Sequence, residues 1–263
     1  MLPPILMVSI VLSMASAVQS VVGFGLAMFA VPLLLWSGID LLPAVFLVLA
    51  TSFAGSIVGV ARLKSSFDIR KSAFASALRI LGIIPGYTLA VASQGSPTDL
   101  KAAIGFTIAL GVVGQSRKFV KFGRNVSSDH LAPADQNVQP SKKAAPWAFF
   151  GSGILMGWLG MGGPPLIFWL LSGRQCPKVS RSFLYGVYMF TIPFQLALMT
   201  VHRPETALFC LPLLAVAIPC SVLAGAVGLR VGDLLNTDRL HRLSLVLLSL
   251  LACKSIVEWL QSL

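Results

Sequence analysis

The fold is decided by the stretch Gly153-Ile154-Leu155-Met156-Gly157-Trp158-Leu159-Gly160-Met161-Gly162-Gly163-Pro164-Pro165, in the second half of the chain. It lies within an apolar run, but its glycine cluster followed by two prolines is unsuited to the interior of a helix. The prolines fit the first turn of a new helix, where a missing backbone N–H costs nothing. The sequence therefore predicts an apolar segment that is broken into two shorter helices.

A similar break is predicted in the first half, at Val22-Gly23-Phe24-Gly25-Leu26. About half of the chain separates Gly23 from Gly160, and both breaks lie in the first apolar segment of their half. Weak internal symmetry with glycine-broken segments at matching positions is typical of secondary transporters.

The composition indicates that the bilayer is the solvent. Of 263 residues, 56% are hydrophobic and only 11% are charged, and the mean hydropathy is +0.85. Soluble domains carry roughly a quarter charged residues. At about 20 residues per crossing, the length allows seven or eight membrane segments. We expect an all-α polytopic membrane protein, which argues against a soluble enzyme, a disordered chain and a disulfide scaffold.

Apolar runs bounded by charge, proline or glycine divide the chain into two sets of four segments. The first set is 4–36, 42–61, 72–92 and 100–115, and the second is 146–171, 179–201, 206–229 and 240–260. We therefore expect a first repeat at 1–115, a basic cytoplasmic linker at 116–145 and a second repeat at 146–263. The N-terminal run lacks the basic flank of a secretory signal, so we expect it to belong to the mature fold.

The basic residues test the topology, because Lys and Arg collect in cytoplasmic loops. They fall mainly in four groups, which begin at Arg62, Arg117, Arg174 and Arg230. If every segment crossed, the last two groups would face the side opposite to the first two. If the segment containing Gly160 enters and leaves on one side, all four groups face the cytoplasm. Extending this to the first half predicts two inverted-topology repeats, each with a re-entrant segment and three transmembrane helices.

Broken helices at membrane depth predict a binding site for an anion. Irregular backbone is tolerated there only where it is buried in protein or lines a water-filled cavity. The N-terminus of each second half-helix would offer unpaired N–H groups and the positive end of the helix dipole. The candidate binding residues are Gly23, Phe24, Gly25, Gly160, Met161, Gly162, Gly163 and Pro164 in the breaks, with Gln19, Ser20, Tyr188, Gln195 and Arg79 on neighbouring segments.

Several of these residues have a second interpretation. The polar side chains of Gln19, Ser20, Tyr188 and Gln195 are equally suited to hydrogen bonds between helices. Arg79 either reaches toward the membrane surface or lends its charge to the cavity. The GxxxG pair Gly55 and Gly59 is expected to serve helix packing, as these glycines lie outside the breaks.

Other functional classes have little support in the sequence. The cysteines Cys176, Cys210, Cys220 and Cys253 are scattered singly, without metal-ligand spacing. The net charge of +11 is explained by basic cytoplasmic loops, so no nucleic-acid partner is expected. No cluster of acid, base and nucleophile falls within the predicted membrane segments. We therefore predict no enzyme activity, no cofactor and no metal site.

The broken segments resemble the sulfite exporter TauE/SafE family, also called TSUP. The resemblance rests on GILMGWLGMGGPP at 153–165 and on Gly23-Phe24-Gly25 with Pro32. Leu26 and Ala27 stand where the family motif has further glycines. The resemblance implies a multi-pass permease of the bacterial inner membrane for sulfite, sulfonates or related organosulfur anions.

The sequence thus predicts a secondary transporter, most simply an exporter, of a small sulfur-containing oxyanion bound at half-helix N-termini near the midplane. The alternatives are a permease for a carboxylate or an inorganic anion, and then a membrane-embedded enzyme or an assembly factor. The expected partners are the anion and the lipid bilayer, and a homodimer stays open.

Overall fold

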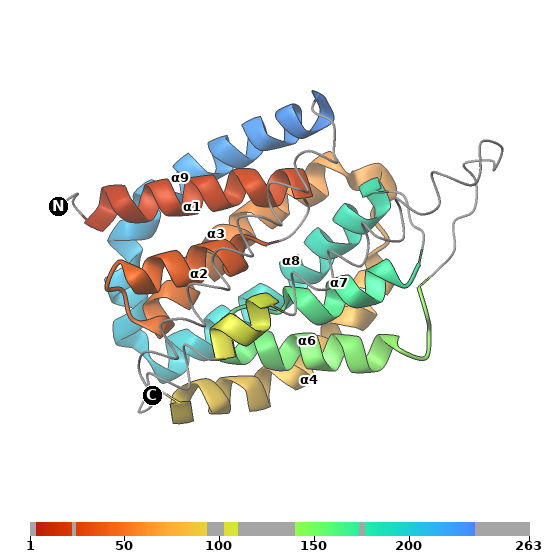
Figure 1. Ribbon diagram of the computed structural model, residues 1–263, viewed down its shortest axis with the longest axis horizontal. Helices are drawn as coiled ribbons and strands as arrows, with labels where there is room; N and C mark the ends of the chain where they lie inside the picture. Colours follow the sequence, from red (N-terminus) through yellow and green to blue (C-terminus); the bar gives the residue numbers. More distant parts are fainter. Residues whose placement is uncertain (1–3, 23–24, 94–102, 110–139, 174–176, 235–263) are drawn as a thin grey trace.

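The computed structural model describes residues 4–22, 25–93, 103–109, 140–173 and 177–234, and the regular structure in these ranges is helical. The helices lie roughly along one direction and form a single bundle (Figure 1). Large apolar side chains cover its outside, among them Met14, Phe74, Trp147 and Leu223. An apolar surface of this extent suits contact with lipid.

The first half contains α1 (Pro4–Val22), α2 (Leu26–Trp36), α3 (Leu41–Arg62), the short 3-10 helix η1 (Lys64–Ser66) and α4 (Ile69–Ala92). The second half contains α6 (Ala145–Leu159), α7 (Gly163–Leu171), α8 (Pro177–His202) and α9 (Pro204–Leu234). Residues 103–109 are also helical.

Four of the described helices, α3, α4, α8 and α9, are long and apolar enough to cross a membrane. They correspond to the segments predicted at 42–61, 72–92, 179–201 and 206–229. The predicted segment at 100–115 is described only at 103–109, while the segment at 240–260 and most of the linker lie outside the described residues.

Both predicted helix breaks are present. The first lies between the end of α1 at Val22 and the start of α2 at Leu26, and the second between α6 and α7. Gly25 and Gly160 have φ angles of 107° and 70°. Only glycine adopts this left-handed region without strain, so each break depends on its glycine. Pro164 lies in the first turn of α7, as the sequence predicts.

The two ends of the α6–α7 segment lie together. The backbone N–H of Ser141, just before α6, donates to Oγ of Ser172 at the end of α7 (3.2 Å), and Nε1 of Trp169 donates to the carbonyl of Ser141 (2.9 Å). The rings of Phe149 and Trp169 meet edge to face with centroids 4.8 Å apart. The broken segment is therefore a helical hairpin, visible in green in Figure 1.

The first helix of each broken segment packs on a long helix from the other half of the chain. The closest helix pairs in the bundle are α4 with α6 and α1 with α9, while α3 and α8 also pack on one another. Oγ of Ser16 on α1 donates to the carbonyl of Ser221 on α9 at 2.8 Å. Each half of the chain thus packs its first helix on a long helix of the other half, an exchange of helices across the bundle.

Glycines bring the backbones of α4 and α6 into contact. A Cβ at Gly82 or Gly86 would overlap the carbonyl oxygen of Phe150 or Ile154, and a Cβ at Gly157 would overlap that of Ile83. Small residues at this spacing are the usual basis for close helix packing in membranes. The close contact of these two GxxxG motifs, Gly82–Gly86 and Gly153–Gly157, was not predicted from the sequence.

The GxxxG pair on α3 shows the expected close packing at Gly59 but not at Gly55. A Cβ at Gly59 would lie 2.6 Å from the ring of Tyr185, which is the close packing predicted. A Cβ at Gly55 would meet no atom within 4 Å. The packing interpretation is therefore wrong for Gly55, because no neighbouring helix approaches its Cβ position closely.

One end of the bundle, which we call the basic end, carries Arg62, Lys71, Lys178 and Arg230 near helix termini. Oγ of Ser182 donates to the carbonyl of Leu63 at 3.5 Å, which joins the start of α8 to the end of α3. Asp68 caps α4 by accepting from the N–H of Lys71 at 3.1 Å, and this hydrogen bond lowers the pKa of the Asp68 carboxyl.

We expect Gly157→Leu to destabilise the fold, because the larger side chain would force α6 away from the backbone of α4. Overpacking of this kind costs about 1–3 kcal/mol or more, which corresponds to a fall of roughly 5 °C in the unfolding midpoint. Thermal unfolding of purified protein in detergent measures the change.

Gly151→Leu is the matched control on α6, because a Cβ at Gly151 meets nothing within 4 Å. Equal midpoints for the two variants would contradict the close α4–α6 packing.

Candidate functional site

The two helix breaks meet at a cavity of about 40 Å³. One water molecule needs roughly 10–15 Å³ on the same measure, so the space suits a few waters or a small anion. We call it the central cavity. Its lining residues are Gln19, Gly25, Leu26, Ala27, Met28, Leu49, Ser52, Arg79, Met156, Gly160, Met161, Gly162, Gly163, Tyr188 and Ile192.

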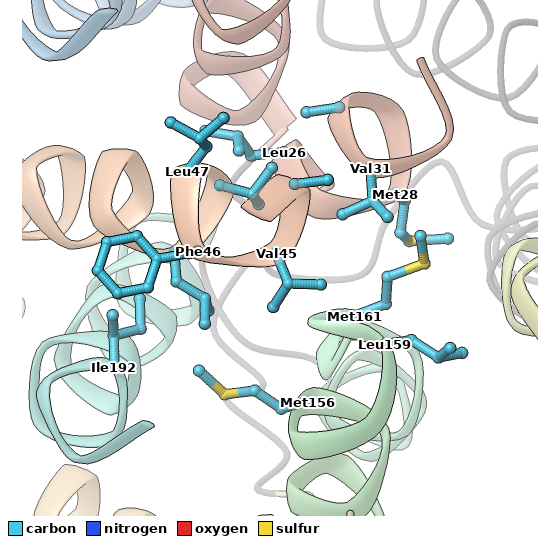
Figure 2. Close-up of a cluster of buried hydrophobic side chains, with 14 of the residues drawn as sticks. Leu26, Met28, Val31, Val45, Phe46, Leu47, Met156, Leu159, Met161 and Ile192 are labelled. Carbon is cyan, nitrogen blue, oxygen red and sulfur yellow. The ribbon is translucent and has the colours of Figure 1, made fainter. Parts of the chain in front are cut away.

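Part of this lining is apolar. Figure 2 shows Met28 on α2 and Met161 in the second break close together, with Met156 and Ile192 on the neighbouring helices. Methionine side chains are flexible and polarizable, so they adapt to the shape of a bound group. The cavity thus combines an adaptable apolar wall with polar groups at the breaks.

The N-terminus of α2 faces the central cavity. The first hydrogen bond of this turn runs from the N–H of Phe29 to the carbonyl of Gly25 at 3.1 Å. The N–H groups of Leu26, Ala27 and Met28 precede it and have no intrahelical partner. Gly25 is the N-cap residue of α2, and no side chain of the described chain caps this helix terminus. These three donors therefore remain for a ligand.

The second break offers fewer donors than expected. The N–H groups of Gly160 and Met161 are used within α6, since they donate to the carbonyls of Met156 (2.9 Å) and Leu155 (3.3 Å). Pro164 and the proline after it carry no N–H. The donors of this helix terminus are thus Gly162 and Gly163, where no described side chain forms a cap.

Arg79 brings a positive charge to the same place. Its side chain is 1% exposed and lies about 15 Å along α4 from the helix start, at 1.5 Å per residue. Among the described residues, Nε and Nη1 have no hydrogen-bond partner. The guanidinium carbon lies 5.0 Å from the ring centroid of Tyr188. Arg79 therefore points into the bundle and does not reach toward the membrane surface.

The ion pairs of the described chain lie elsewhere, at Lys71–Asp68 and Arg203–Glu205. A cation–π contact contributes about 2 kcal/mol when it is desolvated. Burying a charge costs several kcal/mol. The ring of Tyr188 therefore does not compensate the buried charge of Arg79, and a negatively charged ligand would.

Gly162 makes room for the guanidinium. A Cβ at this position would overlap Nη2 of Arg79 and would lie 2.6 Å from the carbonyl oxygen of Ser152. The Ser152 hydroxyl donates to the carbonyl of Gly162, which fixes the break against α6. The glycine thus allows the arginine and the second break to lie side by side.

The structure brings most of the predicted site residues together. Those that line the central cavity are Gln19, Gly25, Arg79, Gly160, Met161, Gly162, Gly163 and Tyr188. Gly23 and Phe24 lie outside the described residues. The glycine breaks were therefore a good guide to the position of the cavity.

Three predicted residues are placed elsewhere. Gln195 donates from Nε2 to the carbonyl of Met156 at 2.7 Å, which is the interhelical hydrogen bond considered as its alternative. Pro164 is buried in α7 without lining the cavity, and Ser20 lines a second cavity. Ser52 also lines the cavity and was not predicted; its signal in the sequence is the adjacent hydroxyl pair Thr51-Ser52 in a mostly apolar helix.

Comparison with protein families assigns nearly the whole chain to one family. The model of the family "Sulfite exporter TauE/SafE" matches residues 8–255, which includes both helix breaks. The chain belongs to this family. Members of the sulfite exporter TauE/SafE family are transporters, so the chain is a multi-pass membrane permease. Searches of curated proteins and of solved structures found no match.

We expect Gly162→Ala to weaken anion binding by about tenfold or more, because the methyl group displaces a guanidinium whose charged hydrogen bonds contribute about 1.5–3 kcal/mol each. Its φ of −73° suits any residue, so the effect is steric. The rise in unfolding midpoint with added sulfite or methanesulfonate measures binding.

Gly163→Ala is the neighbouring comparison, because a Cβ there meets only Ile167 at an ordinary 3.6 Å. It should lose much less affinity than Gly162→Ala. Equal losses in the two variants would argue against a role for the space beside Arg79.

Proposed function

We propose that the protein is a secondary transporter that exports a small sulfur-containing oxyanion, such as sulfite or an organosulfonate. The observation that carries this proposal is the buried guanidinium of Arg79, without a carboxylate partner among the described residues, at the cavity where two uncapped helix N-termini meet. Three backbone donors from α2 and two from the second break surround the same space.

The energies suit reversible binding. Each partly buried helix terminus contributes up to about 2 kcal/mol with an anion. Each hydrogen bond to a charged group adds about 1.5–3 kcal/mol. Removing the anion from water costs several kcal/mol. The balance is favourable but modest, so the anion can enter and leave.

The substrate class follows from the two kinds of wall. Backbone N–H groups and a guanidinium bind oxygens of an anion. The methionines and Ile192 would accommodate a short alkyl group. This combination favours sulfite and small sulfonates, and a carboxylate or an inorganic anion is the alternative that competition experiments distinguish.

We also propose two inverted repeats, 1–115 and 146–263, joined by the cytoplasmic linker 116–145. The exchange of helices supports this arrangement, since α1 packs on α9 and α6 packs on α4. The hydrogen bond between Ser141 and Ser172 supports a re-entrant α6–α7, because both ends of that segment lie together. Both breaks would then reach the interior from opposite sides.

The charges support an orientation with the basic end in the cytoplasm of a bacterial cell, following the positive-inside rule. A membrane potential that is negative inside favours the exit of an anion by about 2.3 kcal/mol per charge per 100 mV. Export by alternating access therefore requires no further energy source for a monoanion that is not strongly concentrated outside.

Replacement of Arg79 tests the function directly. We expect Arg79→Met to reduce the flux of labelled sulfite in proteoliposomes by about tenfold or more, because the charge and its hydrogen bonds are lost. Arg79→Lys should retain part of the flux, since the positive charge remains.

Arg70→Met is the matched control, because Arg70 is exposed at the start of the same helix. Its flux should equal that of the wild type. Unchanged flux in Arg79→Met would exclude the central cavity as the binding site.

The topology is tested with single cysteines in a background without native cysteines. Ser172→Cys should react with impermeant thiol reagents from the cytoplasmic face, and Arg203→Cys from the opposite face. The physical reason is that Ser172 ends a re-entrant segment at the basic end, while Arg203 lies between α8 and α9 at the other end. Labelling of both positions from one face would contradict the re-entrant topology.

A further inference from the structure

A second cavity lies next to the central one. It measures about 10 Å³, roughly the space of one water molecule. Helices α1, α3, α8 and α9 enclose it. Its lining residues are Ser16, Gln19, Ser20, Gly55, Val58, Tyr185, Ser221, Val222, Gly225 and Ala226.

The lining of the second cavity is rich in buried hydroxyl groups. Ser16, Ser20, Tyr185 and Ser221 are between 1% and 7% exposed. Among the described residues, Oγ of Ser221 has no hydrogen-bond partner. A buried polar atom without a hydrogen-bond partner lowers the stability of the fold by about 1–3 kcal/mol, so a polar molecule in the cavity would be favourable.

On two of its helices, the second cavity lies nearer the basic end than the central cavity does. Gln19 lines both cavities and is 6% exposed. On α3, Gly55 lines the second cavity and Ser52 lines the central cavity, and Gly55 is the nearer of the two to Arg62 at the basic end. On α8, Tyr185 precedes Tyr188, again nearer the basic end.

The corresponding interface in the other half is packed through glycine backbone. By the exchange of helices, the α1–α9 contact that flanks the second cavity corresponds to the α4–α6 contact. There, the backbones around Gly82, Gly86, Gly153 and Gly157 lie too close together to admit a Cβ. The α1–α9 contact is also close, because a Cβ at Gly228 would lie 2.7 Å from the carbonyl oxygen of Ala17, but at the second cavity it is lined by the hydroxyls of Ser16, Ser20 and Ser221.

We infer that the second cavity is the inner passage of the transporter, through which a small oxyanion moves between the basic end and the central cavity, with Gln19 at the boundary. This inference rests on the proposed function. The hydroxyls of Ser20, Tyr185 and Ser221 are neutral donors that bind an anion weakly. Weak binding suits a passage, because conduction requires an ion to leave as readily as it enters.

Gly55→Leu fills the passage, because a Cβ at Gly55 meets no atom within 4 Å and the rest of the side chain exceeds the space of the second cavity. Sulfite flux in proteoliposomes should fall about tenfold or more, while the rise in unfolding midpoint with sulfite should stay at the wild-type value. Gly151→Leu, which introduces the same side chain at an open position away from both cavities, should keep flux and binding within about twofold of wild type.

Full flux in Gly55→Leu would overturn the passage, and so would a loss of sulfite binding equal to the loss of flux. Absence of both flux and anion binding in the wild type would instead overturn the proposed function. The two failures are therefore distinguishable.

A labelling experiment keeps the inference testable if Gly55→Leu does not fold. In the cysteine-free background, Ser221→Cys should react with an anionic methanethiosulfonate added at the cytoplasmic face, and methanesulfonate should slow the reaction. Arg70→Cys is the control, because Arg70 is exposed at the basic end, and methanesulfonate should not affect its reaction rate. Reaction of Ser221→Cys only from the outer face, or from neither face, would overturn the passage.

Discussion

Unpaired backbone donors cannot be left in the hydrocarbon of a membrane, and this constraint governs the centre of the molecule. The N-terminus of α2 and the break before α7 each leave N–H groups without an intrahelical partner. The chain places them around one cavity and adds the buried charge of Arg79. A small anion would satisfy all three features at once, and this is why we propose the central cavity as the binding site.

The close packing of α4 on α6 holds this arrangement together. The backbone of α6 at Gly153 lies directly against the carbonyl of Arg79, and the guanidinium occupies the space that a Cβ at Gly162 would need. The hydroxyl of Ser152 fixes the carbonyl of Gly162 from the same helix. The arginine and the second break are therefore positioned by one rigid helix pair, although they belong to different halves of the chain.

The sequence predicts the parts of the fold that local chemistry determines. The breaks at Gly25 and Gly160 follow from glycine and proline, and the long apolar runs mark the helices α3, α4, α8 and α9. The rotation of each helix is harder to predict, because residues facing lipid and residues facing the core are both apolar. On α4, Ile83 is fully buried and Ile84 is 49% exposed. For this reason the α4–α6 contact and the open position at Gly55 were not predictable from sequence patterns, and for Gln195 the sequence left ligand contact and an interhelical hydrogen bond as equal alternatives.

The packing also indicates which parts would move together during alternating access. Arg79 and the break before α7 belong to the α4–α6 pair, whereas α2 follows directly from α1, which packs on α9. An anion bound as we propose, by the N–H groups of Leu26–Met28 and by Arg79, would therefore bridge the two helix pairs. Transport requires an interaction that differs between conformations. The bound anion would supply this interaction, because it would draw together a helix terminus from one pair and a cation from the other. The two breaks differ in their donors. The N-terminus of α2 offers backbone N–H groups. In the break before α7, Pro164 and Pro165 remove two N–H groups, and the α4–α6 pair offers the charge of Arg79 instead.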